Sequence, residues 1–418
     1  LQGPSDKLSD SKTETSGVLI FPCLDRGKIL FDEDNYETQK ISDYIKAPLG
    51  GFFCNGAIGP LSPGDPTTVF GSSTVVAMMS PVSPETPVGP FKVQQAALDE
   101  KLEDDSDDLE KEVEVVRRDV NSGRRVNTGL VEFSVVENLG QPSNKLEAIV
   151  WEKEREVENM RERMALGDLI YQVKQYMKIP KNQNLVDVYA ALKESASKPV
   201  AVIGEIKKFS PNSGELRDSF DEVAIASQYK SSGVAALSIV TEKQFFGCSY
   251  EDLKEIKAIA PDLPVICSDF FIYPYQIYKT RMAGADAIKI LAAGLPDTDL
   301  PYFHKIARAV GMKVIVGVST TRQLEQVLKI PDIEMISIVN RNLANWKVQK
   351  GRVEKLMNHP DLKAAQEKGV IVLAEGGYAS KADIEEAAAA GIKGVIVGDS
   401  LLQEPNPGAA VKDKLGVE

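Results

Sequence analysis

From about Pro199 to the C-terminus, short apolar runs alternate with longer amphipathic stretches. The apolar runs are Val200–Ile206, Ala236–Val240, Val265–Ile266, Ala287–Leu291, Val314–Val318, Met335–Val339, Val370–Leu373 and Gly394–Val397. Runs without polar alternation are typical of strands buried on both faces, and a helix after each strand makes the sheet parallel. The pattern therefore predicts an α/β fold, a (β/α)₈ barrel over residues 199–418.

A helical pattern precedes this barrel. Its apolar side chains recur at helical spacing, and glutamate and arginine occupy the other faces. These apolar residues are Leu146, Ile149, Val150, Val157, Met160 and Met164. They predict a long amphipathic helix in an N-terminal extension of the barrel, residues 129–198.

The first part of the chain has a different pattern. Val18–Pro22 is a short apolar run, Tyr36–Ile45 has helical character, and Gly50–Leu61 and Thr67–Met79 have β character. Glycine and proline separate these pieces, as expected between short elements. We predict a small α+β segment over residues 1–95.

A run of charged residues separates the two patterns. From Leu98 to about Val126 the chain is rich in Asp and Glu and poor in apolar residues. Self-repulsion and the lack of apolar surface oppose compact folding. This stretch predicts an acidic linker over residues 96–128, helical in part at most.

The net charge changes the range of functions to consider. The 418 residues carry a net charge of −12, which repels phosphodiester backbones and anionic lipids and argues against a nucleic-acid partner. No stretch reaches the roughly 20 continuous apolar residues of a membrane span, so no transmembrane segment is expected. The chain begins at Leu1 rather than Met, and any targeting peptide would already have been removed.

Cysteine and histidine give no sign of a metal site. The cysteines are widely spaced and form no C-x-x-C pair, so we expect them to be reduced and buried; they are Cys23, Cys54, Cys248 and Cys267. His304 and His359 fall on or beside predicted helices rather than at strand ends. Neither is a good candidate for a general base.

Candidate chemistry lies at the carboxyl ends of the predicted strands, where barrels of this kind bind their ligands. The residues there are Glu205 and Lys207, Ser268 and Asp269, Gly317 and Ser319, Asn340 and Arg341, Glu375-Gly376-Gly377, and Gly398-Asp399-Ser400. Cations together with glycine corners after strands seven and eight predict a site for a phosphorylated, sugar-like anion. An alternative for the first pair is an ion pair inside the barrel mouth.

Several of these segments resemble the motifs of one enzyme family. Glu205–Gly214 resembles the first-strand signature of indole-3-glycerol-phosphate synthase, and Phe245–Leu253 resembles its second loop. The resemblance continues in order through Asp269–Tyr278, Asn340–Leu343, Glu375-Gly376-Gly377 and Val397–Leu401, and Leu146–Arg163 resembles the N-terminal helix of the cyanobacterial and plastid branch. It implies a plastid or cyanobacterial setting.

The resemblance implies a reaction and its groups. The family closes the indole ring of a carboxyphenylamino-deoxyribulose phosphate with loss of carbon dioxide and water, without metal or organic cofactor. It implies catalytic roles for Lys207, Glu205 and Glu375. The substrate-binding positions that it implies are Ser210, Phe270, Arg341, Gly377 and Gly398.

At three catalytic positions this sequence departs from the family. Ser268 stands in place of the strand-three lysine that acts as general acid, Gly317 in place of the strand-five glutamate, and Val339 in place of the strand-six asparagine. Ser319 and Gly376 also replace a usual histidine and serine. The Ser268 hydroxyl cannot replace an ammonium as acid, Gly317 offers no proton, and Val339 cannot replace an orienting amide.

The N-terminal segment resembles the end of a FIST domain, a ligand-sensing module. The resemblance rests on Gly27–Phe31 and Gly50–Pro60. Ala57 stands for that family's usual glutamate and Phe70 for its usual histidine, and only about the last 80 residues of such a domain are present.

Two hypotheses of different classes follow. The first is a synthase-like barrel that has lost catalysis and serves as a binding or scaffold subunit, docked through residues 1–145 to other proteins of a plastid assembly. The second is an active synthase in which Asp269 or Lys208 replaces the missing groups. A sensor of a phosphorylated ligand is a further alternative, which the FIST-like segment favours.

Overall fold

The structure, a computed structural model, describes in full residues 108–117, 142–195 and 200–416. In the rest of the chain it describes the backbone of short strands alone. The chain divides into two compact units, Leu1–Lys92 and Val93–Glu418.

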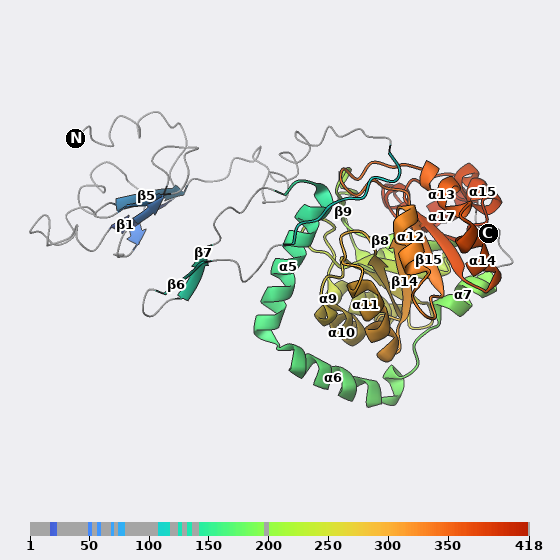
Figure 1. Cartoon of the computed structure of the whole chain (residues 1–418), viewed down its shortest axis with the longest axis horizontal. Helices are drawn as coiled ribbons and strands as arrows, with labels where there is room; N and C mark the ends of the chain where they lie inside the picture. Colours follow the sequence, from blue (N-terminus) through green and yellow to red (C-terminus); the bar gives the residue numbers. More distant parts are fainter. Residues whose placement is uncertain are drawn as a thin grey trace, which may run out of the picture. The chain divides into compact units, whose positions relative to one another are not determined.

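Eight parallel strands close into a barrel in the second unit (Figure 1). They are β8 (Ala201–Ile206), β11 (Ala236–Val240), β12 (Val265–Ser268), β13 (Ala287–Leu291), β14 (Lys313–Val318), β15 (Met335–Val339), β16 (Ile371–Glu375) and β17 (Gly394–Val397). β17 pairs with β8 and closes the ring. The predicted barrel is confirmed, and each predicted apolar run coincides with one of its strands to within one residue at its start, because strands buried on both faces are mostly apolar.

Side chains inside the barrel form layers that determine where the site lies. Ile203, Ile266, Ile315 and Leu373 come from alternate strands and belong to the buried interior cluster. Side chains two positions apart on a strand point to the same face. Glu205, Ser268, Gly317 and Glu375 therefore form the next layer toward the carboxyl ends, where the apolar filling gives way to polar groups.

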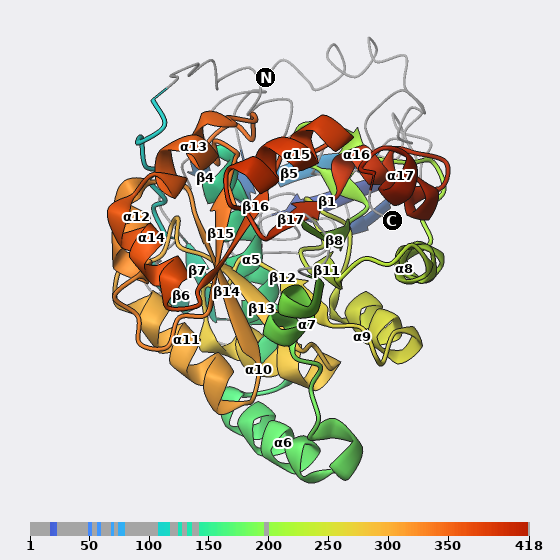
Figure 2. The ribbon, with the colours of Figure 1, turned by 90° about the vertical axis from the view of Figure 1, so that its right-hand side faces the viewer.

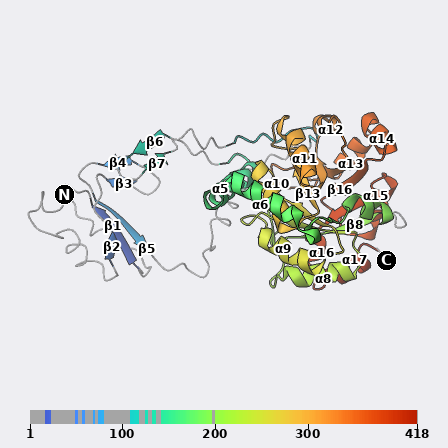
Figure 3. The ribbon, with the colours of Figure 1, turned by 90° about the horizontal axis from the view of Figure 1, so that it is seen from below.

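Helices surround the barrel (Figure 2). In chain order they are α8 (Glu222–Ser231), α9 (Tyr250–Ile259), α10 (Pro274–Ala283), α11 (Asp299–Ala309), α12 (Thr321–Val327), α13 (Gly351–Met357), α14 (Pro360–Glu367), α15 (Lys381–Ala389), α16 (Asp399–Leu402) and α17 (Pro407–Asp413). Gly284 ends α10 with a φ of 92°, a conformation that costs a side-chain-bearing residue free energy. α17, the last helix of the chain, packs against α8, the first helix of the barrel (Figure 3).

A helical extension contacts the barrel at both ends. The predicted amphipathic helix is α5 (Lys145–Arg163), followed by α6 (Leu166–Lys178), a 3₁₀ turn at Pro180–Asn182 and α7 (Val188–Glu194). The Lys145 backbone N–H donates to the Ala344 carbonyl at 2.9 Å, so α5 begins at the loop after β15. Val188 and Leu192 of α7 join the interior cluster and close the amino ends of the strands.

Part of the predicted acidic linker contacts the barrel directly. We call residues 108–117 the strap; they form a turn at Leu109–Glu110 and then run without helix or strand. Glu110 accepts hydrogen bonds from the Thr321 N–H at 2.9 Å and hydroxyl at 3.0 Å, and lies 3.0 Å from the Lys355 ammonium. Glu112 pairs with Arg322.

The far end of the strap holds α5. The Trp151 indole N–H donates to the Val116 carbonyl at 2.8 Å, and the Val116 N–H donates to Glu147 at 2.8 Å. Arg117 pairs with Glu154. The charge run is ordered here because cations of the barrel neutralise its carboxylates and a backbone N–H donates to one of them. The composition of the run itself could not indicate these partners.

Short strands form the described part of the first unit. β1 (Gly17–Pro22) pairs parallel with β2 (Leu49–Gly51) and antiparallel with β5 (Thr74–Met79), and β3 (Ala57–Gly59) pairs with β4 (Thr68–Phe70). A further hairpin, β6 (Arg124–Asn127) with β7 (Glu132–Val135), belongs to the second unit. The predicted helix over 36–45 lies outside the described residues, as do Cys23 and Cys54. The boundaries at 95, 128 and 198 stay predictions.

Candidate anion-binding and acid/base site

A cavity of about 190 Å³ lies at the carboxyl ends of the barrel strands. Most of the predicted site residues line it: Glu205, Lys207, Ser268, Phe270, Val339, Arg341, Glu375, Gly377 and Gly398. Ser210 and Gly317 are not among the lining residues. The topology thus brings together side chains from β8, β12, β15, β16 and β17 that are far apart in the sequence.

Lys207 lies between two carboxylates. Its ammonium is 2.5 Å from the Glu205 carboxylate, as the ion-pair alternative predicted, and 2.7 Å from that of Asp399. Burial opposes both charges, but Asp399 and Glu205 raise the pKa of Lys207, while Lys207 and Lys289 lower the pKa of Glu205. Lys207 is a cation and Glu205 an anion at neutral pH.

The Asp399 carboxylate contacts three predicted site residues: Lys207, predicted as catalytic, and Arg341 and Ser210, predicted to bind the substrate. Besides Lys207, Arg341 approaches its carboxylate at 3.1 Å, and the Ser210 hydroxyl donates to it at 3.1 Å. Burial alone would raise the pKa of the Asp399 carboxyl, but Lys207 and Arg341 hold it well below its usual value. These three groups therefore form a ready binding place for an anion, which the protein's own carboxylate occupies.

Glycine backbone lines the same end of the cavity. Gly377 has a φ of 84°, and a Cβ added there would lie 2.6 Å from Val348. A Cβ added at Gly398 would lie 2.7 Å from the Glu205 carboxylate. Gly377 therefore requires glycine, whereas a side chain at Gly398 would force the Glu205 carboxylate to shift.

Aromatic rings form one wall of the cavity. The Phe270 ring centroid is 5.6 Å from that of Phe246 and 6.2 Å from that of Trp346. Trp346 has a φ of 65°, a left-handed conformation that costs about 1–3 kcal/mol. Arg341 donates to the Trp346 carbonyl at 3.0 Å and helps to hold this conformation. The wall suits a flat or apolar part of a ligand.

Ser268, Gly317 and Val339, where the resemblance implies a lysine, a glutamate and an asparagine, carry no carboxylate, ammonium or amide. The Ser268 hydroxyl hydrogen-bonds the Ser238 hydroxyl at 2.7 Å. A Cβ added at Gly317 would lie 2.8 Å from Leu291 and 3.6 Å from Glu375, so Leu291 occupies the space beside it. Val339 contributes an apolar part of the wall.

Lys289 is a site residue that the sequence analysis missed. It lies on β13, lines the cavity, and pairs with Glu375 of β16. Its neighbour in register on β12 is Ser268. The available signal was a lysine within the otherwise apolar run Ala287–Leu291, since a buried strand rarely carries an unpaired charge.

Lys208 and Asp269, the two replacements considered in the sequence, each have partners within the protein, although Asp269 also lines the cavity. Lys208 is 38% exposed at its side chain and lies 3.5 Å from Glu215. Asp269 accepts hydrogen bonds from Tyr250 at 2.7 Å and from the Phe270 N–H at 2.8 Å. It also lies 2.8 Å from the fully buried ammonium of Lys153.

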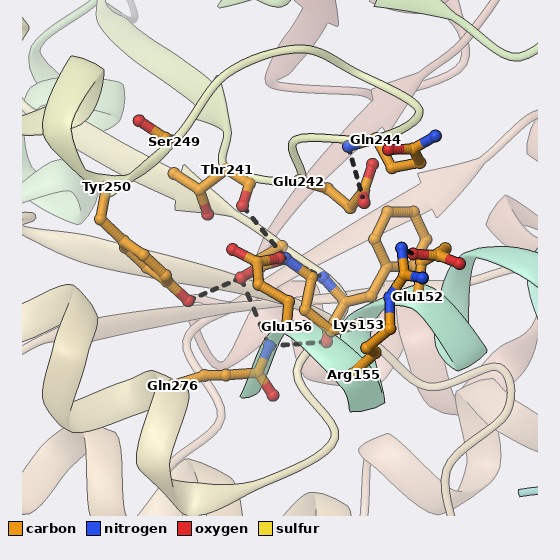
Figure 4. Close-up of polar contacts among 12 residues, drawn as sticks. Glu152, Lys153, Arg155, Glu156, Thr241, Glu242, Gln244, Ser249, Tyr250 and Gln276 are labelled. Carbon is orange, nitrogen blue, oxygen red and sulfur yellow. Dashed lines mark hydrogen bonds and ion pairs between the residues drawn. The ribbon is translucent and has the colours of Figure 1, made fainter. Parts of the chain in front are cut away.

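Lys153 is the centre of a buried polar network under α5 (Figure 4). Its ammonium donates to the Glu156 carboxylate at 2.6 Å and to the Thr241 carbonyl at 3.1 Å. Glu242 lies nearby, and burial raises its pKa to about 7 although Lys153 acts in the opposite direction. The network attaches the extension to the loops that border the site.

The histidines lie on or beside helices, as predicted: His304 on α11 and His359 at the start of α14. Cys248 and Cys267 are buried free thiols. Within the described ranges, no group of three or more His, Cys, Asp or Glu side chains could hold a metal ion. None of the helices in the described part is long and apolar enough to cross a membrane.

Comparison with known proteins agrees with this arrangement. The family model described as indole-3-glycerol phosphate synthase matches residues 146–414. The chain belongs to the indole-3-glycerol phosphate synthase family. Relatives named indole-3-glycerol phosphate synthase include proteins from cyanobacteria.

The relative from Microcystis aeruginosa is 39% identical over 272 residues, covering 65% of this chain and 89% of the relative. That from Acaryochloris marina is 40% identical over 279 residues, covering 67% and 89%. That from Trichodesmium erythraeum is 38% identical over 299 residues, covering 72% and 97%. The family match thus includes the barrel and α5, and leaves the first unit outside it.

Proposed function

We propose that this synthase-family barrel binds a small phosphorylated ligand but has lost indole ring closure. The proposal rests on a contrast within one site: the groups that can bind an anion are present, whereas the positions implied for proton transfer lack acid/base groups. Lys207, Arg341 and Ser210 converge on one anion, whereas Ser268, Gly317 and Val339 carry no group that transfers a proton at neutral pH. Anion binding needs only fixed donors and charge, so it outlasts the loss of acid/base groups.

An active synthase is the second candidate. The relatives' names favour it, and Lys289 supplies an ammonium beside the retained Glu375. The Lys289 ammonium is on the fourth strand, whereas the resemblance implies a lysine on the third, and it is already paired with Glu375. We therefore rank this candidate second. Asp269 is a weaker replacement, because Lys153 and Tyr250 engage it.

Phosphate binding tests the first half of the proposal. Inorganic phosphate should bind to the full chain at millimolar concentration, and Arg341→Ala should weaken that binding about 10- to 100-fold, because a hydrogen bond to a charged group contributes about 1.5–3 kcal/mol. Asp399→Asn should strengthen binding, since it removes the competing carboxylate without changing the side-chain shape. Calorimetry measures all three proteins, and the absence of both heat and a shift in melting temperature for the unmodified chain would contradict the proposal.

We also propose that the chain is a subunit of a larger plastid assembly, attached through residues 1–145. Catalysis needs neither a FIST-like segment nor an acidic run, whereas both suit docking. The full chain should copurify with other proteins from plastid extracts, and a chain that begins at residue 146 should not. The strap contacts both the barrel and α5. A chain that begins at residue 108 keeps these contacts and is therefore the matched control. Unchanged association after deletion would refute the docking role.

A further inference from the structure

Lys289 is an amine in the cavity that the proposed ligand binding does not use. It comes from β13, the fourth strand of the barrel, and its side chain reaches Glu375 on β16, the seventh. Its relative exposure is 7% and that of Glu375 is 9%. Both residues line the cavity together with the anion-binding residues Lys207 and Arg341.

The two lysines of the cavity differ in their partners. Lys207 contacts Glu205 and Asp399, and Asp399 in turn binds Arg341. Within the described residues, the Lys289 ammonium forms a hydrogen-bonded ion pair with Glu375 alone, although its charge also acts on Glu205 from a greater distance. Lys207 thus belongs to the group of residues that would bind an anion. Lys289 instead lies beside one carboxylate, that of Glu375, which can accept its proton.

We propose that Lys289 forms an imine with the carbonyl carbon of a phosphorylated aldehyde or ketone held in this cavity. The position of the phosphate at Lys207 and Arg341 rests on the proposed function. In an eight-stranded ring, strand four lies opposite strand eight, where Gly398 and Asp399 follow β17. A ligand anchored at that end would extend across the mouth toward Lys289.

The chemical steps balance with the groups present. Glu375 accepts a proton from the Lys289 ammonium, and the neutral amine adds to the carbonyl carbon. Proton transfer from nitrogen to oxygen gives a neutral carbinolamine. Glu375 then returns its proton to the hydroxyl, the C–O bond breaks, and water leaves. The net change is ammonium plus carbonyl to protonated imine plus water, with no oxidant or reductant.

The ion pair of Lys289 with Glu375 is compatible with both the starting ammonium and the final protonated imine. The ammonium and the protonated imine carry the same positive charge at the same nitrogen, so the Glu375 carboxylate stabilises each of them. Ser268, in register with Lys289 on β12, adds a hydroxyl to the cavity wall without filling it as a longer side chain would. The position therefore admits a carbonyl group beside the amine.

Borohydride trapping tests the proposal, because it reduces an imine to a stable secondary amine. The full chain is incubated with dihydroxyacetone phosphate and borohydride, and labelled lysines are located by peptide mass spectrometry. We expect Lys289 to be labelled at least about tenfold more than any other lysine, since a held ligand has a high effective concentration. Lys289→Arg keeps the positive charge beside Glu375 and should abolish this label while the melting temperature stays close to that of the unmodified chain.

The outcomes separate this inference from the proposed function. Label spread over exposed lysines, with none enriched at Lys289, would overturn imine formation even where calorimetry shows phosphate binding. Equal labelling of Lys289 by dihydroxyacetone and by its phosphate would support the imine and count against the phosphate end. Preferential labelling by the phosphate that Arg341→Ala removes would support both.

Discussion

The full chain will close the indole ring of the carboxyphenylamino-deoxyribulose phosphate at least about 10⁴-fold more slowly than a cyanobacterial relative, because each missing acid/base group contributes about 10²–10⁴-fold. Ser268 and Gly317 stand where the family resemblance implies a lysine and a glutamate, and Val339 where it implies an asparagine. The measurement is product fluorescence, with the Microcystis aeruginosa relative as the positive control. Turnover within tenfold of that relative would falsify the loss of catalysis.

Restoring the groups sharpens this test. Ser268→Lys, Gly317→Glu and Val339→Asn together should recover some turnover. The structure shows two obstacles: Leu291 lies 2.8 Å from the Cβ position at Gly317, and Lys289 holds Glu375. Adding Lys289→Leu should therefore increase turnover above that of the triple variant. If both variants fold, by circular dichroism, and neither turns over substrate, the site differs from an active one at more than these positions.

Replacing Lys153 by Met will lower the free energy of unfolding by about 3–5 kcal/mol, the range for breaking a buried ion pair on one side. The ammonium is fully buried and lies 2.8 Å from Asp269 and 2.6 Å from Glu156. Its removal leaves these carboxylates, and Glu242, desolvated without the cation that they share. Urea denaturation of the full chain measures the change, and the same substitution at exposed Lys174 on α6 is the control.

The loss should depend on pH. Burial raises the folded-state pKa of Glu242 to about 7, above its unfolded value, so the folded state binds more protons than the unfolded state between these values. The contribution of Glu242 to stability therefore falls as pH rises through this window. Without Lys153 the carboxylates are more costly when ionised, so the destabilisation should be largest above pH 7 and smaller near about pH 5. A loss no larger than for Lys174→Met would mean that the network does not stabilise the fold. A large loss that is equal at both pH values would contradict the titration of Glu242 in this range.

The sequence by itself determined the barrel, the amphipathic helix α5 and the place of the site. Predominantly apolar runs such as Ala236–Val240 and Met335–Val339 coincide with strands, because burial on both faces favours apolar side chains. Strand-end residues such as Glu205 and Arg341 lie in one cavity, because parallel strands present their carboxyl ends at one face. The family follows from the same ordered motifs.

Only the tertiary structure decided which charges meet. Lys289 and Glu375 are 86 positions apart, and Ser210 and Asp399 are 189 apart, so their pairing depends on closure of the ring. The strap is the opposite case: Glu110 and Glu112 indicated repulsion within their own segment, yet Lys355, Arg322 and the Thr321 N–H bind them. Local composition gives the charge of a segment, but the partner that neutralises it lies elsewhere in the chain, and the fold alone brings the two within hydrogen-bonding distance.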